Sequence, residues 1–149
     1  MRTLALIALA LATTLAGCAD YRLRGRVVAG DASYITVVSA DDPALAEGRG
    51  LPGATVTITT DPERISREQA GTGVSGPDGA FAVEFTEPGG GLLLYDVGVR
   101  VTRAGYAPAE LFLELPKGSK RLLVVLAPGR EQPGSREEDP LEQYRRFRE

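Results

Sequence analysis

Apolar and polar side chains alternate with a period of two through most of residues 21–128. This period is typical of strands that turn one face to a core and the other to water. The alternating runs predict strands at residues 22–28, 34–38, 54–58, 73–75, 80–85, 92–102 and 109–115. Residues 121–126 are apolar without a break, which is typical of a strand covered on both faces. Gly and Pro clusters separate the runs, and residues 34–38 are either a separate strand or the continuation of the first. The sequence thus predicts an all-β sandwich of about seven strands.

Turn residues lie between the predicted strands. Gly76-Pro77-Asp78-Gly79 predicts a tight antiparallel hairpin between residues 73–75 and 80–85, because Pro fixes φ and Asp-Gly accepts a left-handed conformation. Residues 39–50 are acidic and Gly-rich and predict an exposed loop, with a short helical turn over 43–47. Residues 60–71 are polar and predict a second loop.

Several of these positions are expected to have structural roles. Gly53 and Gly79 allow backbone angles that a Cβ would penalise, and Phe81 is expected to fill the core directly after its turn. Tyr106, after Gly105, is expected to pack at a corner with its hydroxyl bonded to the backbone. Substitution at these positions should lower stability and should not abolish a reaction.

The N-terminal segment has the pattern of a secretory signal. Arg2 precedes an apolar run at residues 4–15, which is too short to span a bilayer because spanning takes roughly 20 residues. Leu15-Ala16-Gly17-Cys18 follows and resembles the lipobox of bacterial lipoproteins. The resemblance implies a cleaved signal peptide at residues 1–17 and lipidation of Cys18. The alternative is an incidental thiol at the end of an ordinary signal peptide.

The lipoprotein resemblance also has consequences for location. It implies a protein held in the cell envelope by its lipid anchor, facing the periplasm. Ala19 follows the cysteine where an Asp would signal retention in the inner membrane, so the outer membrane is favoured, although Asp20 complicates this assignment in some bacteria.

Four motifs in order resemble the carboxypeptidase regulatory-like domain. They are residues 51–56, residues 76–81, the pair Gly105-Tyr106, and the last hydrophobic strand before Pro128. The resemblance implies a prealbumin-like (transthyretin-like) Greek-key sandwich as a domain over residues 18–128. The insertion at residues 29–50 departs from the family pattern. Domains of this family serve peptidases, transporters, sugar-binding systems and stand-alone lipoproteins, so the resemblance implies a fold and not one function.

Composition excludes several functions. The chain of 149 residues has 17 basic and 20 acidic side chains, so it lacks the excess of cations that nucleic-acid binding requires. It contains no His, the usual general base and a common zinc ligand. We therefore expect a protein that is not an enzyme, with no catalytic residue, cofactor or metal. With one Cys it forms no internal disulfide.

Three groups of side chains suggest alternatives. The acidic group comprises Asp41, Asp42 and Glu47, either calcium ligands or, as favoured here, solvated loop residues. The basic group comprises Arg22, Arg24 and Arg26, interpreted as charges protecting an edge strand or as a stripe for an acidic partner or lipid headgroups. The aromatic group comprises Tyr34, Tyr95 and Tyr106, expected at core or corner positions, with sugar stacking as the alternative.

Residues 129–149 are rich in charge and predict a flexible tail, with a short helix starting at Asp139-Pro140. Together these patterns predict a lipid-anchored envelope protein whose non-catalytic sandwich is a binding or scaffold module for a protein or glycan. The alternatives are a structural component of a secretion or transport assembly, and a carbohydrate-binding module.

Overall fold

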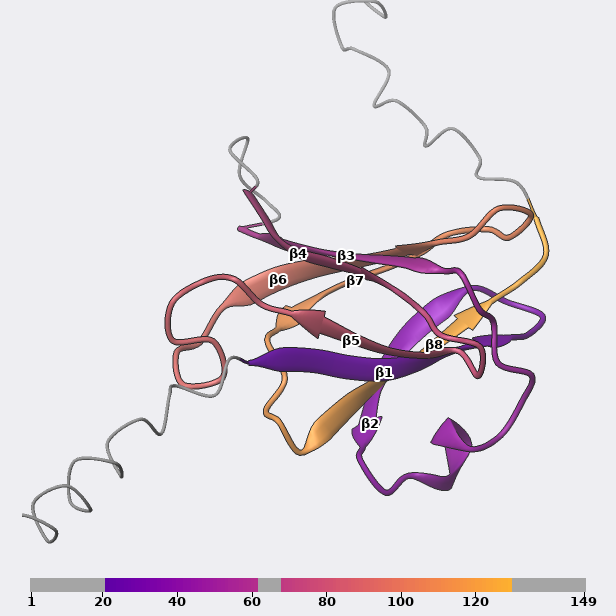
Figure 1. Ribbon diagram of the computed structural model, residues 1–149, viewed down its shortest axis with the longest axis horizontal. Helices are drawn as coiled ribbons and strands as arrows, with labels where there is room; N and C mark the ends of the chain where they lie inside the picture. Colours follow the sequence, from indigo (N-terminus) through magenta and orange to yellow (C-terminus); the bar gives the residue numbers. More distant parts are fainter. Residues whose placement is uncertain (1–20, 62–67, 130–149) are drawn as a thin grey trace, which may run out of the picture.

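The computed structural model describes residues 21–61 and 68–129, and the strands in this part form two four-stranded sheets (Figure 1). The first sheet has the order β2-β8-β1-β5, with strands at Tyr34–Ser39, Lys120–Leu126, Arg22–Ala29 and Ala80–Glu84. The second has the order β4-β3-β6-β7, with strands at Glu68–Val74, Thr55–Thr60, Asp96–Thr102 and Ala109–Glu114. The predicted all-β sandwich is confirmed, with eight strands in place of seven.

The core lies between the two sheets and consists of the inward side chains of both. Val56 and Ile58 of β3 and Val97, Val99 and Val101 of β6 are fully buried. They belong to one cluster with inward residues of the first sheet: Leu23, Val27, Val83, Leu122, Val124 and Leu126. Each set occupies alternate positions along its strand, so the period of two in the sequence corresponds to the inner face of each sheet.

The strand β8 is covered on both faces, as its unbroken apolar run predicts. Its inner residues join the main core, while Leu123 and Val125 form a second cluster with Val28. Ala44 and Leu45 pack against this second cluster from a single 3-10 turn, η1 (Pro43–Leu45). The predicted exposed loop at 39–50 with its short helical turn is thus present, and its residues Ala44 and Leu45 also cover part of the outer face of β8.

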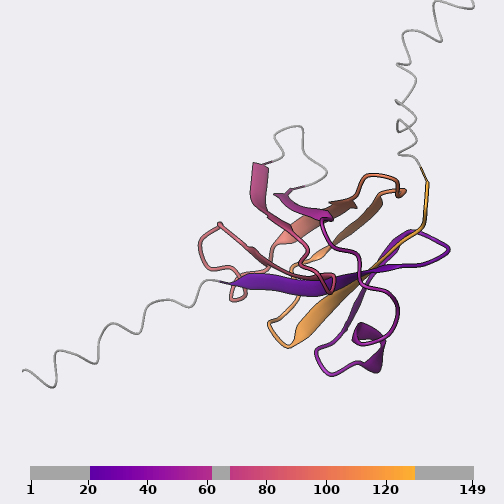
Figure 2. The same cartoon turned by 45° about the vertical axis from the view of Figure 1, so that its right-hand side comes forward.

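The strands β1 and β8 run parallel, and every other neighbouring pair is antiparallel. Both strands therefore begin at one end of the sandwich, beside the loop between β5 and β6, and finish at the other (Figures 1 and 2). We call these the Tyr21 end and the Tyr106 end. The strand β1 has 8 residues, so at ~3.3 Å per residue the two ends lie about 25 Å apart.

The predicted hairpin around residues 76–79 is wrong. The tight turn is present, but β4 pairs with β3 and β5 pairs with β1, so the turn passes from one sheet to the other. The strand β4 also begins at Glu68, inside the predicted polar loop. Its sequence includes Gly71 and Gly73, and an added Cβ on Gly71 would lie 2.4 Å from the backbone oxygen of Glu84. Close approach of the two sheet edges thus requires small residues, which hide the strand from a hydrophobic pattern.

The predicted strand at residues 92–102 is wrong in its first third. The strand β6 begins at Asp96, and the three leucines before it lie in a loop. Gly89 and Gly91 have φ values of 75° and 81°, which turn the chain and interrupt any extended segment.

Predictions for the N-terminal segment and the tail fall outside the described residues. They concern the signal peptide at 1–17, the lipobox residues Leu15, Ala16 and Gly17, Cys18, and residues 130–149.

Candidate functional site

The turn at residues 76–79 is a structural element that connects the sheets. Gly79 has a φ of 83°, and a Cβ added there would lie 2.2 Å from the carbonyl oxygen of Val27. The Val27 amide donates a hydrogen bond of 2.9 Å to the Gly79 carbonyl. The Asp78 carboxylate accepts a bond of 3.0 Å from the amide of Ala80, and Phe81 is buried directly afterwards. These residues fix the path of the chain between the two sheets.

The three arginines of β1 do not protect a sheet edge, because β1 lies between β8 and β5. Arg22 and Arg24 are exposed, whereas Arg26 donates hydrogen bonds to four backbone carbonyls. Its acceptors are Leu45 at 2.8 Å, Glu47 at 2.9 Å, Gly48 at 3.3 Å and Asp78 at 2.9 Å. Arg26 therefore ties the loop at 39–50 and the turn at 76–79 to the sheet.

A groove crosses the Tyr106 end of the sandwich. It consists of two adjoining cavities of about 470 Å³ and 360 Å³ that share Arg103, Ala104 and Tyr106. The segment at 49–53, before β3, forms one wall, and Gly129, the last described residue, belongs to the larger cavity. Turns from distant parts of the sequence thus meet at this end.

Buried hydrogen bonds position the wall at residues 49–53. Ser75 donates a bond of 2.7 Å to the carbonyl of Leu51 and accepts one of 2.9 Å from the amide of Ala54. Leu51 also donates through its amide to Val27 at 2.8 Å, and Ala29 donates to the carbonyl of Arg49 at 2.9 Å. The backbone of this wall is fixed to β1 and to Ser75, which directly follows β4, so the groove is preformed.

Two guanidinium groups flank Tyr106 in the groove. Arg49 donates a hydrogen bond of 3.1 Å to the Tyr106 hydroxyl. The guanidinium carbon of Arg103 lies 4.9 Å from the centre of the same ring, a cation–π contact. The expected bond from this hydroxyl to the backbone is wrong, because the hydroxyl contacts an arginine side chain instead.

Among the described residues, the lining of both cavities contains two cations and no carboxylate. Guanidinium groups present planar pairs of N–H donors that match the geometry of carboxylate and phosphate groups. The described part of the groove is thus suited to an anionic group. The sequence did not indicate this site, because Arg49 and Arg103 are isolated in unrelated loops and no motif links them.

The other candidate groups do not form sites. The Asp42 carboxylate accepts a hydrogen bond of 2.9 Å from the amide of Ala44 and caps η1. Within residues 21–61 and 68–129, no three potential metal ligands cluster. Tyr34 is 49% exposed on the edge strand β2, whereas Tyr95 lies at the Tyr21 end and donates to the carbonyl of Pro88 at 2.7 Å. The three tyrosines thus do not form a common stacking platform.

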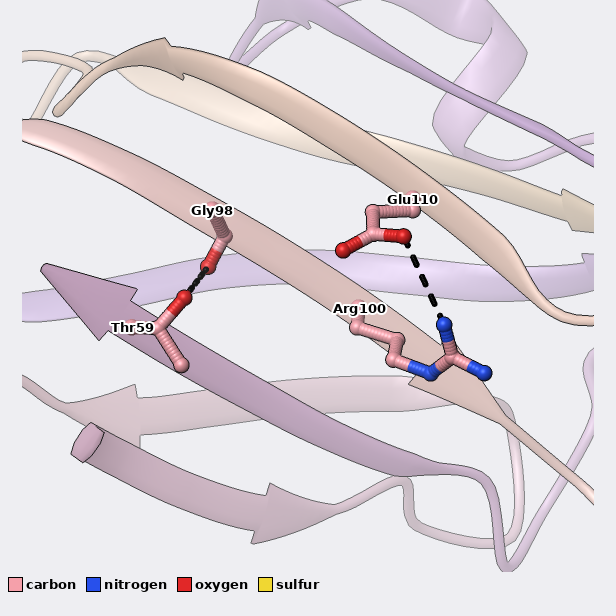
Figure 3. Close-up of polar contacts among 4 residues, drawn as sticks. All are labelled: Thr59, Gly98, Arg100 and Glu110. Carbon is pink, nitrogen blue, oxygen red and sulfur yellow. Dashed lines mark hydrogen bonds and ion pairs between the residues drawn. The ribbon is translucent and has the colours of Figure 1, made fainter. Parts of the chain in front are cut away.

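The outer face of the second sheet carries polar contacts between neighbouring strands. Arg100 of β6 faces Glu110 of β7 with an ion pair of 3.4 Å, and the Thr59 hydroxyl donates to the carbonyl of Gly98 at 3.4 Å (Figure 3). An added Cβ on Gly98 would lie 3.1 Å from the ring of Phe112, so this ring fills the space above the glycine. An exposed ion pair of this kind adds little to stability.

Comparison with known proteins leaves the family open. No family model matches the chain, and no curated protein matches it. Among solved structures, a 9R-lipoxygenase from Cyanothece PCC8801 is similar at 12% identity and a TM-score of 0.38. The similarity covers 77% of this chain and 18% of that one. At this level it supports no statement about the function of this chain. In the part that the structure describes, no helix has the length and apolarity to cross a bilayer.

Proposed function

We propose that this protein is a lipid-anchored binding module of the bacterial cell envelope that recognises an acidic partner protein and catalyses no reaction. The observation that carries the proposal is the groove at the Tyr106 end, where Arg49 and Arg103 flank Tyr106 and the described lining residues include no carboxylate. The lipobox resemblance at Leu15-Ala16-Gly17-Cys18 and the resemblance to carboxypeptidase regulatory-like domains are parts of the same proposal.

The proposed anchor and the groove are compatible in position. Cys18 lies three residues before Tyr21, so the chain places the lipid within about 11 Å of the Tyr21 end. The groove lies at the opposite end, about 25 Å away along β1. A protein anchored at Cys18 can thus hold its arginine groove away from the membrane, toward the periplasm.

An acidic protein surface suits this groove better than a neutral sugar. Sugars bind by stacking on open aromatic faces, but Arg103 occupies one face of Tyr106. The chain also contains no Trp. The two arginines of the groove match carboxylates on a partner. Charged pairs of this kind guide association and fix the register of an interface. A structural role in an envelope assembly would use the same contact.

Replacing Cys18 by Ser is expected to remove the anchor. Incorporation of radiolabelled palmitate should stop, and the protein should leave the membrane fraction, because the thioether to the lipid no longer forms. Membrane fractionation and labelling of whole cells measure both effects. Unchanged labelling in Cys18→Ser would refute lipidation at this residue.

Replacing both Arg49 and Arg103 by Ala is expected to reduce copurification of a partner from solubilised envelopes by about tenfold or more, because two charged contacts are lost. The matched control is Arg22→Ala with Arg24→Ala, which removes the same charge from the outer face of β1. Raising the salt concentration should weaken the wild-type interaction.

The same purification separates the alternatives. Equal losses in the two double variants would mean that only net charge matters and would contradict a specific groove. Retention on peptidoglycan or polysaccharide resin, unchanged in the Arg49 and Arg103 variant, would instead identify a carbohydrate-binding module. Hydrolysis of esters or peptides that one side-chain change abolishes would refute the non-enzymatic role.

A further inference from the structure

Three consecutive leucines form the most exposed apolar segment of the described residues. Leu92, Leu93 and Leu94 are 90%, 58% and 79% exposed. Single exposed apolar residues are ordinary on a protein surface, but an adjacent group of this kind marks a surface that contacts a protein or a membrane. We call these three residues the leucine tip.

The loop that carries the leucine tip has a defined conformation. The amides of Leu92 and Leu93 donate to the carbonyl of Gly89 at 3.0 Å and 2.9 Å, and the Tyr95 hydroxyl closes the loop on Pro88 at 2.7 Å. The ring of Phe85 packs edge-on against Tyr95 at 5.2 Å between centroids. The leucines are therefore held outward by an ordered loop and do not result from a frayed strand end.

The leucine tip lies next to the start of β1. An added Cβ on Gly91 would lie 2.6 Å from the ring of Tyr21, and one on Gly90 would lie 3.2 Å from the Tyr21 Cβ. Tyr21 also packs against Phe85 at 6.2 Å and donates its hydroxyl to the carbonyl of Pro116. Burial raises the pKa of this hydroxyl, partly offset by the charge of Arg121, so it stays neutral at physiological pH.

We infer that the leucine tip inserts into the lipid bilayer beside the anchor and fixes the orientation of the sandwich on the membrane. This inference rests on the proposed anchor at Cys18. The chain between Cys18 and Tyr21 reaches at most about 11 Å, and Tyr21 contacts the loop of the leucine tip. An acyl-anchored Cys18 thus brings these leucines to the headgroup region.

The occupant is a bilayer because of this continuity with the anchor. A single anchoring point leaves a domain free to rotate, and leucines that enter the boundary between headgroups and acyl chains supply a second contact. Tyr21 and Tyr95, half-buried under the loop, are side chains that favour such a boundary.

A fluorescence experiment tests the insertion in the lipidated protein. The lone native Cys is the anchor, so Leu92→Cys introduces one free thiol for an environment-sensitive dye. In phosphatidylcholine vesicles, lipids with a spin label in the acyl chain should quench this dye. The matched control is Ala32→Cys, an exposed site in the turn between β1 and β2 at the opposite end, which should show little quenching.

A second variant tests the side chains themselves. Replacing all three leucines by Ser in the Cys18→Ser protein should lower its residual partition into phosphatidylcholine vesicles about tenfold or more, with an unchanged unfolding transition because the leucines are exposed. Equal partition of the two proteins would overturn the inference.

The outcomes separate this inference from the proposed anchor. If palmitate labelling persists in Cys18→Ser, the anchor is wrong. If the anchor is correct but dyes at residues 92 and 32 are quenched equally, insertion is wrong. A dye at residue 92 that is shielded only in native envelopes and never in vesicles of pure lipid identifies a protein as the occupant and also overturns insertion.

Discussion

Replacing Gly79 by Ala is expected to lower the free energy of unfolding by about 3 kcal/mol or more. The new Cβ would lie 2.2 Å from the carbonyl oxygen of Val27 and 2.9 Å from the amide nitrogen of Leu51. Both atoms belong to backbone that is hydrogen-bonded in place, so the clash requires movement of β1 or of the segment before β3. Urea unfolding followed by circular dichroism measures the loss.

Gly53→Ala is the matched control for this clash. Gly53 has a φ of 74°, near the 83° of Gly79, but no atom lies within 4 Å of its added Cβ. Its loss should therefore be limited to left-handed backbone strain, roughly 1–2 kcal/mol. Similar losses for the two variants would show that backbone strain alone accounts for the requirement at Gly79.

Replacing Arg26 by Met is expected to lower the free energy of unfolding by about 2 kcal/mol, because hydrogen bonds from a charged donor to four carbonyls are lost. The figure is modest because most of these carbonyls regain water. Met keeps the aliphatic length of the side chain, so the change mainly removes the donors. Amide hydrogen exchange at residues 44–47 should also accelerate, since Arg26 fastens this loop to the sheet.

Arg24→Met is the control for this change. Arg24 is two residues away on the same face of β1 and is exposed, so its replacement should change stability by less than about 0.5 kcal/mol. Faster exchange at residues 44–47 in the Arg24 variant would contradict the assignment of loop fastening to Arg26.

Most strands were predictable because apolar side chains alternate with polar ones along them and so indicate which face is buried. The alternation in β3, β6 and β7 and the continuous apolar run of β8 predict the burial that the structure shows, including the cover on both faces of β8. Most of β4 was missed, and only its end was predicted as a strand at 73–75, because Gly71 and Gly73 lack the side chains that form a pattern. Residues 92–94 were assigned to a strand because they directly precede the alternating run that begins at Tyr95, and alternation does not show where a strand begins.

The candidate groove was not predictable in the same way. Arg49, Arg103 and Tyr106 belong to separate turns, and each has an ordinary explanation when it is considered alone. The arginines that did form a pattern, at positions 22, 24 and 26, led to a wrong interpretation as edge protection. Spacing along one strand shows which side chains share a face, but it does not show which strand lies beside it.

By itself, the sequence determined the all-β architecture, the exclusion of histidine chemistry and the expectation of a lipid anchor at Cys18, because periodicity, composition and short motifs are local properties of a chain. The tertiary structure alone decided that β1 is an inner strand, that Arg26 fastens a loop, that two arginines meet at Tyr106 and that three leucines face outward beside Tyr21. These facts depend on sheet order and on contacts between distant segments, and no local pattern encodes them.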